Sequence, residues 1–187
     1  GGTAAGLNFP YSVHVDGAGR LWVTDLGNNR VLMFHGASTL PGFGAVADRV
    51  FGQPNFIETA QGTTKAKMHL PTYAIVDAAD NLWVAEYNNN RVLKFANVSS
   101  LASGAEATVV LGQPNFTTAT PGTNNITMDG PTGLAMDGAG RLWVTDQDNQ
   151  RVLRFDNAAS LGNGAPANGV LGQTNFTGTT SGTTAQN

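Results

Sequence analysis

Residues 131–155 read PTGLAMDGAGRLWVTDQDNQRVLRF, and this stretch carries the pattern that decides the fold. The pattern occurs twice more, at residues 10–34 and 71–95, so its period is about 60 residues. Laying residues 10–35 on residues 131–156 without a gap gives 16 identities in 26 positions. A fixed period of this length is typical of solenoids, propellers and arrays, in which each repeat folds as one structural unit.

Each copy contains four short apolar stretches that fit β-strands. The stretches are rich in β-branched and aromatic residues, and the turns between the first three are short and carry Gly, Asp and Asn. Connections this short require antiparallel pairing, because a parallel crossover needs about a dozen residues or more. In the first copy the predicted strands lie near residues 11–16, 20–25, 30–35 and 48–53, and the other copies repeat them at offsets of about 60.

One such sheet cannot bury both of its faces, whereas successive sheets stacked face to face can, as in the blades of a propeller. We therefore predict an all-β chain that forms a single segment of a β-propeller, built of three four-stranded antiparallel blades. The blades are predicted at about residues 7–56, 68–116 and 128–176, with inter-blade loops at 57–67, 117–127 and 177–187.

The repeat motif can be written P-x-G-h-h-x-D-x-x-G-x-L-W-V-x-D-x-x-N-x-R-V-x-x-F, and residues 131–155 carry it in full. The first copy has Ser12 in place of the glycine, and the second has Tyr73 there and Glu86 in place of the turn aspartate. In this motif the chain resembles the NHL-repeat family of β-propellers. The resemblance covers essentially the whole chain.

An apolar tail follows each motif, such as VLGQPNF at residues 110–116, and it looks like the longer repeats of secreted bacterial members of the family. Family propellers usually close with about six blades, so the resemblance implies that three copies form half of a six-bladed ring. The family includes lyases, RNA-binding domains and protein-interaction platforms. The resemblance therefore predicts the fold without assigning a function.

Half a ring would expose two broad apolar blade faces, which is more than a soluble monomer tolerates. We expect Val23 and Leu32 on one open face, and Val144 and Leu153 on the other. Self-association would cover these faces if two chains close a six-bladed ring about a two-fold axis. Further blades of a longer chain would cover them equally well, and the sequence leaves both arrangements open.

An acid, an asparagine and an arginine recur around the second turn of every copy. One interpretation is a ring of carboxylates that holds a cation at the channel mouth, and the other is a structural cluster that caps the turn. Catalysis breaks the symmetry of a repeat, so presence in every copy favours the structural interpretation. The predicted turn clusters are Asp25, Asn28 and Arg30; Glu86, Asn89 and Arg91; and Asp146, Asn149 and Arg151.

Tryptophan occurs once in each copy, in the second predicted strand, as Trp22, Trp83 and Trp143. Both faces of this strand meet neighbouring blades, so we expect blade-core packing rather than stacking on a sugar or base. The DGAG turns at residues 16–19 and 137–140 resemble a calcium loop only superficially. They lack the further acidic ligands of such a loop, and we expect no metal or other cofactor there.

The three histidines, His14, His35 and His69, occupy unrelated positions of the repeat and depart from its symmetry, as a catalytic residue would. We align His69 with Gly130 of the third copy. Lyases of the resembled family converge several histidines and carboxylates on the central channel, often around a metal. Here only His14, on the first strand, is a channel candidate, and it is a weak one.

Composition excludes several classes of function. Charged residues make up 12% of the 187 residues, the net charge is −3, and the ten Lys and Arg residues form no cluster, which argues against nucleic-acid binding. No apolar run approaches the roughly 20 residues needed for membrane insertion. There is no cysteine, so disulfides and thiolate metal sites are excluded.

We therefore favour a non-catalytic scaffold or binding module that presents its loop faces to a protein or glycan partner. The alternative is part of a lyase- or lactonase-type enzyme whose channel site is completed by other blades. The Gly, Thr and Asn richness favours an extracellular protein, although residues 1–6 carry no signal-peptide features, so a leader was removed or the chain is an excerpt. N-x-S/T sequons, which matter only if the source glycosylates its secreted proteins, begin at Asn97, Asn115, Asn125 and Asn175.

Overall fold

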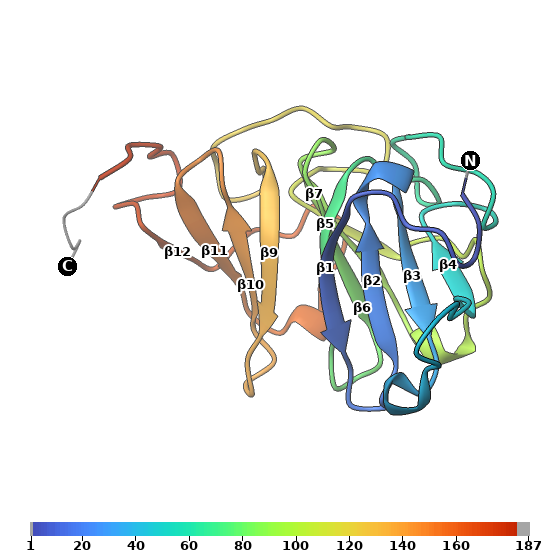
Figure 1. Cartoon of the computed structure of the whole chain (residues 1–187). Coiled ribbons are helices and arrows are strands. Elements are labelled where there is room, and N and C mark those ends of the chain that lie inside the picture. The colour runs from blue at the N-terminus through green and yellow to red at the C-terminus, as the bar shows by residue number, and fades with distance from the viewer. Residues whose placement is uncertain (1, 183–187) are drawn as a thin grey trace.

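The computed structural model describes residues 2–182, which form three four-stranded antiparallel sheets arranged like blades (Figure 1). The strands of blade 1 are β1 (Pro10–Val15), β2 (Leu21–Asp25), β3 (Arg30–Phe34) and β4 (Arg49–Phe51). Those of blade 2 are β5 (Pro71–Val76), β6 (Leu82–Glu86), β7 (Arg91–Phe95) and β8 (Val109–Leu111). Those of blade 3 are β9 (Pro131–Met136), β10 (Leu142–Asp146), β11 (Arg151–Phe155) and β12 (Gly169–Leu171).

The predicted all-β meander is confirmed, since each sheet follows chain order and its neighbouring strands are antiparallel. The only helical elements among residues 2–182 are four single turns, and none is long or apolar enough to cross a membrane. These 3-10 turns are η1 (Leu26–Asn28), η2 (Ala37–Thr39), η3 (Val98–Ser100) and η4 (Ala158–Ser160).

The outer strand of each blade is shorter than predicted, three residues instead of six in blade 1. A glycine in the left-handed region ends it in every copy: Gly52 has φ +82°, Gly112 has φ +81° and Gly172 has φ +86°. Side chains rarely adopt such backbone angles, so the glycine turns the chain out of the sheet at that point.

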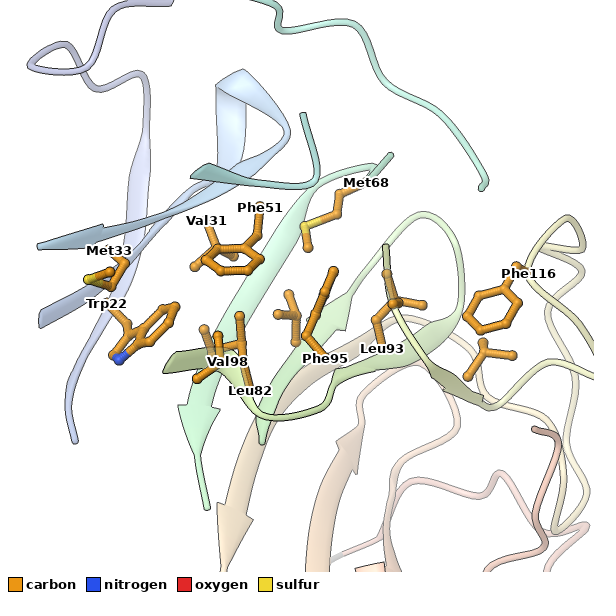
Figure 2. Close-up of a cluster of buried hydrophobic side chains, with 14 residues drawn as sticks. Trp22, Val31, Met33, Phe51, Met68, Leu82, Leu93, Phe95, Val98 and Phe116 are labelled. Atoms are coloured by element: carbon orange, nitrogen blue, oxygen red, sulfur yellow. The ribbon is translucent and has the colours of Figure 1, made fainter. Parts of the chain in front are cut away.

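Neighbouring blades pack face to face through two apolar cores, which we call joint 1 (blades 1 and 2) and joint 2 (blades 2 and 3). Figure 2 shows joint 1, where Phe51 of blade 1 lies between Trp22 of the same blade and Phe95 of blade 2. The ring centroids of Phe51 and Phe95 are 5.4 Å apart in an edge-to-face arrangement. Aromatic pairs of this kind add to the stabilisation that burial provides.

The predicted composition of the open faces is wrong for blade 3, and for blade 1 the predicted residues lie on the open side but are not exposed. Val144 and Leu153 are fully buried in joint 2, because alternation along the strands turns them toward blade 2. Val23 and Leu32 do lie on the open side of blade 1, but they are buried in a small cluster with residues of the β3–β4 loop. The apolar side chains exposed there include those of Val13 and Val15 on the inner strand, 65% and 56% exposed.

Candidate binding face

The recurring acid, asparagine and arginine form a buried cluster in each blade. In blade 2 the Arg91 Nε lies 2.9 Å from Glu86 Oε1, and both side chains are fully buried. The Asn89 amide and the backbone N–H of His69 both donate to Glu86 Oε2. Burial raises the pKa of the Glu86 carboxyl, whereas the Arg91 guanidinium and these hydrogen bonds oppose that rise.

The arginine of each cluster also ties three chain segments together. Arg91 donates to the Phe116 carbonyl after β8 and to the Thr64 and Lys67 carbonyls of the loop before β5. Arg30 and Arg151 make the same set of contacts in their own blades. The carboxylates are thus enclosed by their own blade, and their structural role stays a prediction.

At the opposite end of the blades, the first-hairpin aspartates hold the tryptophans. Trp22 Nε1 donates to Asp16 Oδ2 at 2.8 Å, and Trp83 and Trp143 contact Asp77 and Asp137 in the same way. Burial by itself raises the pKa of Asp16, but the hydrogen bonds from Trp22 and Arg20 outweigh it and lower the pKa. These carboxylates therefore fix the position of the tryptophan side chain in each blade.

A groove of about 500 Å³ separates the first hairpins of blades 1 and 2. Arg20 bridges it, with Nε 2.6 Å from Asp16 Oδ2 and Nη2 2.7 Å from Asp80 Oδ1. The paired charges of Arg20, Asp16 and Asp80 thus link blades 1 and 2 across joint 1. Within residues 2–182, no three His, Asp or Glu side chains lie close enough to hold a metal ion.

The structure separates the three histidines. His14 lies half-buried on β1 beside Trp22, on the side facing blade 2, and burial lowers its pKa. His35 is exposed near Asp48. The alignment of His69 with Gly130 was wrong by one position, because the His69 backbone N–H bonds the cluster acid just as the N–H of Asp129 does in blade 3.

Six exposed or half-buried departures from the repeat lie where the inner strands begin, at the upper end in Figure 1. We call this surface the strand-entry face and define it by six residues. None of the six has the same residue type at the equivalent position of another copy. They are Tyr11, His69, Tyr87, Asn88, Asp129 and Asp148.

One contact on this face joins blades 2 and 3, and a second lies within blade 2. The Tyr87 hydroxyl donates to Asp148 Oδ2 at 2.8 Å, and Asn88 Nδ2 lies 3.0 Å from His69 Nε2. A Cβ on Gly130 would lie 2.6 Å from Asp148 Oδ2 and 2.8 Å from Tyr87 Cε2, so glycine lets these two side chains close over the backbone. Tyr11 of blade 1 is 59% exposed and adds a second phenol.

The carboxylates and phenols of this face perturb one another. Burial and the nearby Asp148 carboxylate raise the pKa of Asp129. The hydrogen bond to Asp148 is the main reason that the pKa of Tyr87 is raised, and burial, Asp129 and Tyr11 add to the effect. The face thus combines aromatic surface with hydrogen-bond acceptors and an imidazole, a set suited to a polar ligand or protein surface.

Sequence reasoning missed all of this face except His69. The test applied to the histidines, comparison of each residue with its two counterparts, would have found it. Tyr87 stands where the other copies have Leu26 and Gln147, and Tyr11 stands where they have Thr72 and Thr132.

Asp148→Asn is expected to lower the pKa of the Tyr87 hydroxyl toward its usual value of 10.0, because the amide removes the negative charge that stabilises the phenol. An ultraviolet titration of tyrosinate formation measures this directly, since the chain has only three tyrosines. Tyr87→Phe assigns the signal. A Tyr87 titration that is identical with and without the Asp148 carboxylate would contradict the geometry.

Three sequon asparagines, Asn97, Asn115 and Asn175, are exposed, whereas Asn125 is half-buried. The Asn115 Oδ1 accepts both the backbone N–H and the hydroxyl of Thr117, at 2.9 and 3.0 Å. Their glycosylation stays a prediction.

Comparison with known proteins agrees with this architecture. A family model described as the NHL repeat matches residues 128–155, which include β9, β10 and β11 of blade 3. Residues 128–155 of this chain therefore match an NHL repeat. Blades 1 and 2 of this chain repeat the same strands and the same buried clusters. No curated protein matches it.

Solved structures share the fold at low identity. A nidogen/laminin complex matches with a TM-score of 0.55 and 17% identity, over 90% of this chain and 49% of that chain. The extracellular domain of a putative one-component system from B. thetaiotaomicron matches with a TM-score of 0.53 and 18% identity, over 89% of this chain and 18% of that chain. Virginiamycin B lyase from Staphylococcus aureus matches with a TM-score of 0.49 and 18% identity, over 80% and 38%. The chain thus spans half or less of these structures' lengths.

Proposed function

We propose that this chain is a non-catalytic binding module, and that the strand-entry face recognises a protein or glycan partner outside the cell. The observation that carries the proposal is that six exposed or half-buried departures from the repeat lie on one face. Packing explains residues that all three blades share, but it does not explain an exposed Tyr11 or a Tyr87 that reaches across to Asp148.

The chemistry of the face supports this function. Tyrosine supplies large, rigid contact area together with a hydroxyl, and it is enriched where proteins bind partners. Asn88, Asp129 and Asp148 add the acceptors and donors that orient a sugar hydroxyl or a peptide group. Two of the solved structures of similar fold are a protein complex and an extracellular domain, which agrees with a binding role outside the cell.

Tyr87→Ala is expected to weaken partner binding at least tenfold, because a buried tyrosine at an interface is worth about 1.4 kcal/mol or more. Ligands are first identified with a glycan array and with an array of secreted and cell-surface proteins. Affinities are then measured for the wild type, Tyr11→Ala, Tyr87→Ala and the control Ala139→Gln, which lies exposed in the first hairpin of blade 3 at the opposite end. A ligand lost in Ala139→Gln and retained in both tyrosine variants would place binding elsewhere.

The enzyme alternative makes a different prediction. A lyase-type site in the channel would hold stoichiometric zinc or calcium after dialysis, detectable by metal analysis. The position of His14 gives it little support, since the side chain lies half-buried on the side that faces blade 2.

A further inference from the structure

Both joints contain the same knob and socket. Met68 of blade 2 lies over Gly52 of blade 1, where an added Cβ would be 2.4 Å from the methionine sulfur. Met128 of blade 3 lies over Gly112 in the same way, with its Cγ and sulfur 2.9 Å from an added Cβ. Both methionines are fully buried. A glycine after the outer strand is therefore the socket, and the apolar residue before the next inner strand is the knob.

Backbone hydrogen bonds repeat between the joints as well. The Val50 carbonyl accepts the N–H of Gly104 at 3.0 Å, and the Val110 carbonyl accepts the N–H of Gly164 at 2.9 Å. Both glycines are held in the left-handed region, with φ +79° for Gly104 and +65° for Gly164. The outer strand of one blade is thus hydrogen-bonded to the loop between the third and fourth strands of the next blade.

A cation completes the outer edge of each joint. Lys94 on β7 donates to the Ala159 carbonyl of η4 in blade 3. In joint 1 the cation comes from β4, where Arg49 donates to the carbonyls of Val98 and Ser99 of η3.

The open face of blade 3 carries the socket half of another joint. A cavity of about 410 Å³ is lined by Val152, Leu171 and Gly172. Leu171 is 54% exposed, whereas its counterparts Phe51 and Leu111 in the two joints are fully buried. The position of the joint cation is held by Arg154, whose Nε lies 2.9 Å from Asp156 Oδ1 on the open face.

The open face of blade 1 carries the knob half. Leu7 stands at the position of Met68 and Met128, and it is 48% exposed where they are fully buried. Gly44 has φ +70°, so it keeps the backbone conformation of Gly104 and Gly164 without the bond that those glycines make inside a joint.

We propose that a second copy of this chain completes the joint, with Leu7 of one copy seated over Gly172 of the other. The Gly44 N–H then donates to the Val170 carbonyl, and Arg154 reaches the η2 carbonyls as Lys94 reaches η4. A two-fold axis makes this contact twice and leaves neither apolar face free. The inference continues an interface already present twice within the chain, and it does not depend on the proposed binding function.

Two positions distinguish this third joint from the others. Asn29 and Asn90 accept the N–H of Leu70 and Gly130 across joints 1 and 2, whereas blade 3 has Gln150 at that place. Phe43, which is 96% exposed, precedes Gly44 where Ser103 precedes Gly104. The third joint therefore lacks the asparagine contact of the other two joints and has an exposed phenylalanine where joint 1 has a serine.

Paired cysteines test the contact cleanly, because the chain has none of its own. Leu7→Cys with Gly172→Cys is expected to give a covalent dimer on mild oxidation at low concentration, and light scattering on the unaltered chain is expected to give twice 19.4 kDa. Gly52→Cys with Met68→Cys reports joint 1, where a Cβ on Gly52 lies 3.1 Å from the Met68 Cβ, and it closes within one chain. Leu7→Cys with Ile126→Cys is the matched control that stays uncrosslinked.

Two results would overturn the proposal. One is a monomer by light scattering, together with no disulfide between Leu7→Cys and Gly172→Cys although the control disulfide between Gly52→Cys and Met68→Cys forms. That result would mean that further blades, and not a second copy, cover the open faces. The other is a ladder of larger covalent oligomers, which would show that the joint forms without closing about a two-fold axis.

Discussion

Replacing Arg91 with methionine is expected to lower the free energy of unfolding by about 3–5 kcal/mol, because it leaves the buried Glu86 carboxylate without its cation. Arg91 also ties β7 to the Phe116 carbonyl and to the loop before β5, so the substitution leaves those carbonyls without their donor. Chemical denaturation followed by tryptophan fluorescence measures the loss.

Two companion variants separate charge burial from simple loss of packing. Arg91→Met combined with Glu86→Gln removes the uncompensated charge and is expected to recover part of the stability. Arg141→Met removes an arginine that is 43% exposed at its side chain and paired with Asp137, and a change of about 1 kcal/mol or less is expected. Equal losses for Arg91→Met and Arg141→Met would remove the basis for calling the Arg91 cluster structural.

Trp83→Ala is expected to cost about 3–5 kcal/mol, because the fully buried indole fills joint 2 and its Nε1 donates to Asp77. Lys94 also lies over this ring, with its Nζ 5.3 Å from the ring centroid. Thermal and denaturant unfolding of the variant both report the change.

Trp143 is the matched comparison, since it has the same place in the repeat but lies on the open face of blade 3 and is only half-buried. In a monomer, Trp143→Ala should cost clearly less than Trp83→Ala. If a second copy covers the face, the cost should grow with protein concentration, because the indole then stabilises the dimer as well. A Trp143→Ala variant that is less stable than Trp83→Ala in dilute monomer would contradict the assignment of the open face.

The local pattern was enough to predict the blades. Turns of four or five residues permit only antiparallel neighbours, so the pairing of the first three strands of each blade follows from spacing alone. The polar clusters were predicted to be structural from their recurrence, because three copies of Asp or Glu, Asn and Arg at one spacing indicate one repeated environment.

The sequence by itself determined the repeat, the strand order and the residues that pack in every blade, because these depend on contacts within one period. Only the tertiary structure decided which side of each strand meets a neighbour. It buried Val144 and Leu153 in joint 2, and it brought Tyr87 to Asp148, 61 residues away. The physical reason is that a propeller joint joins residues one period apart, and side chains there are placed by the stacking of whole blades rather than by local sequence.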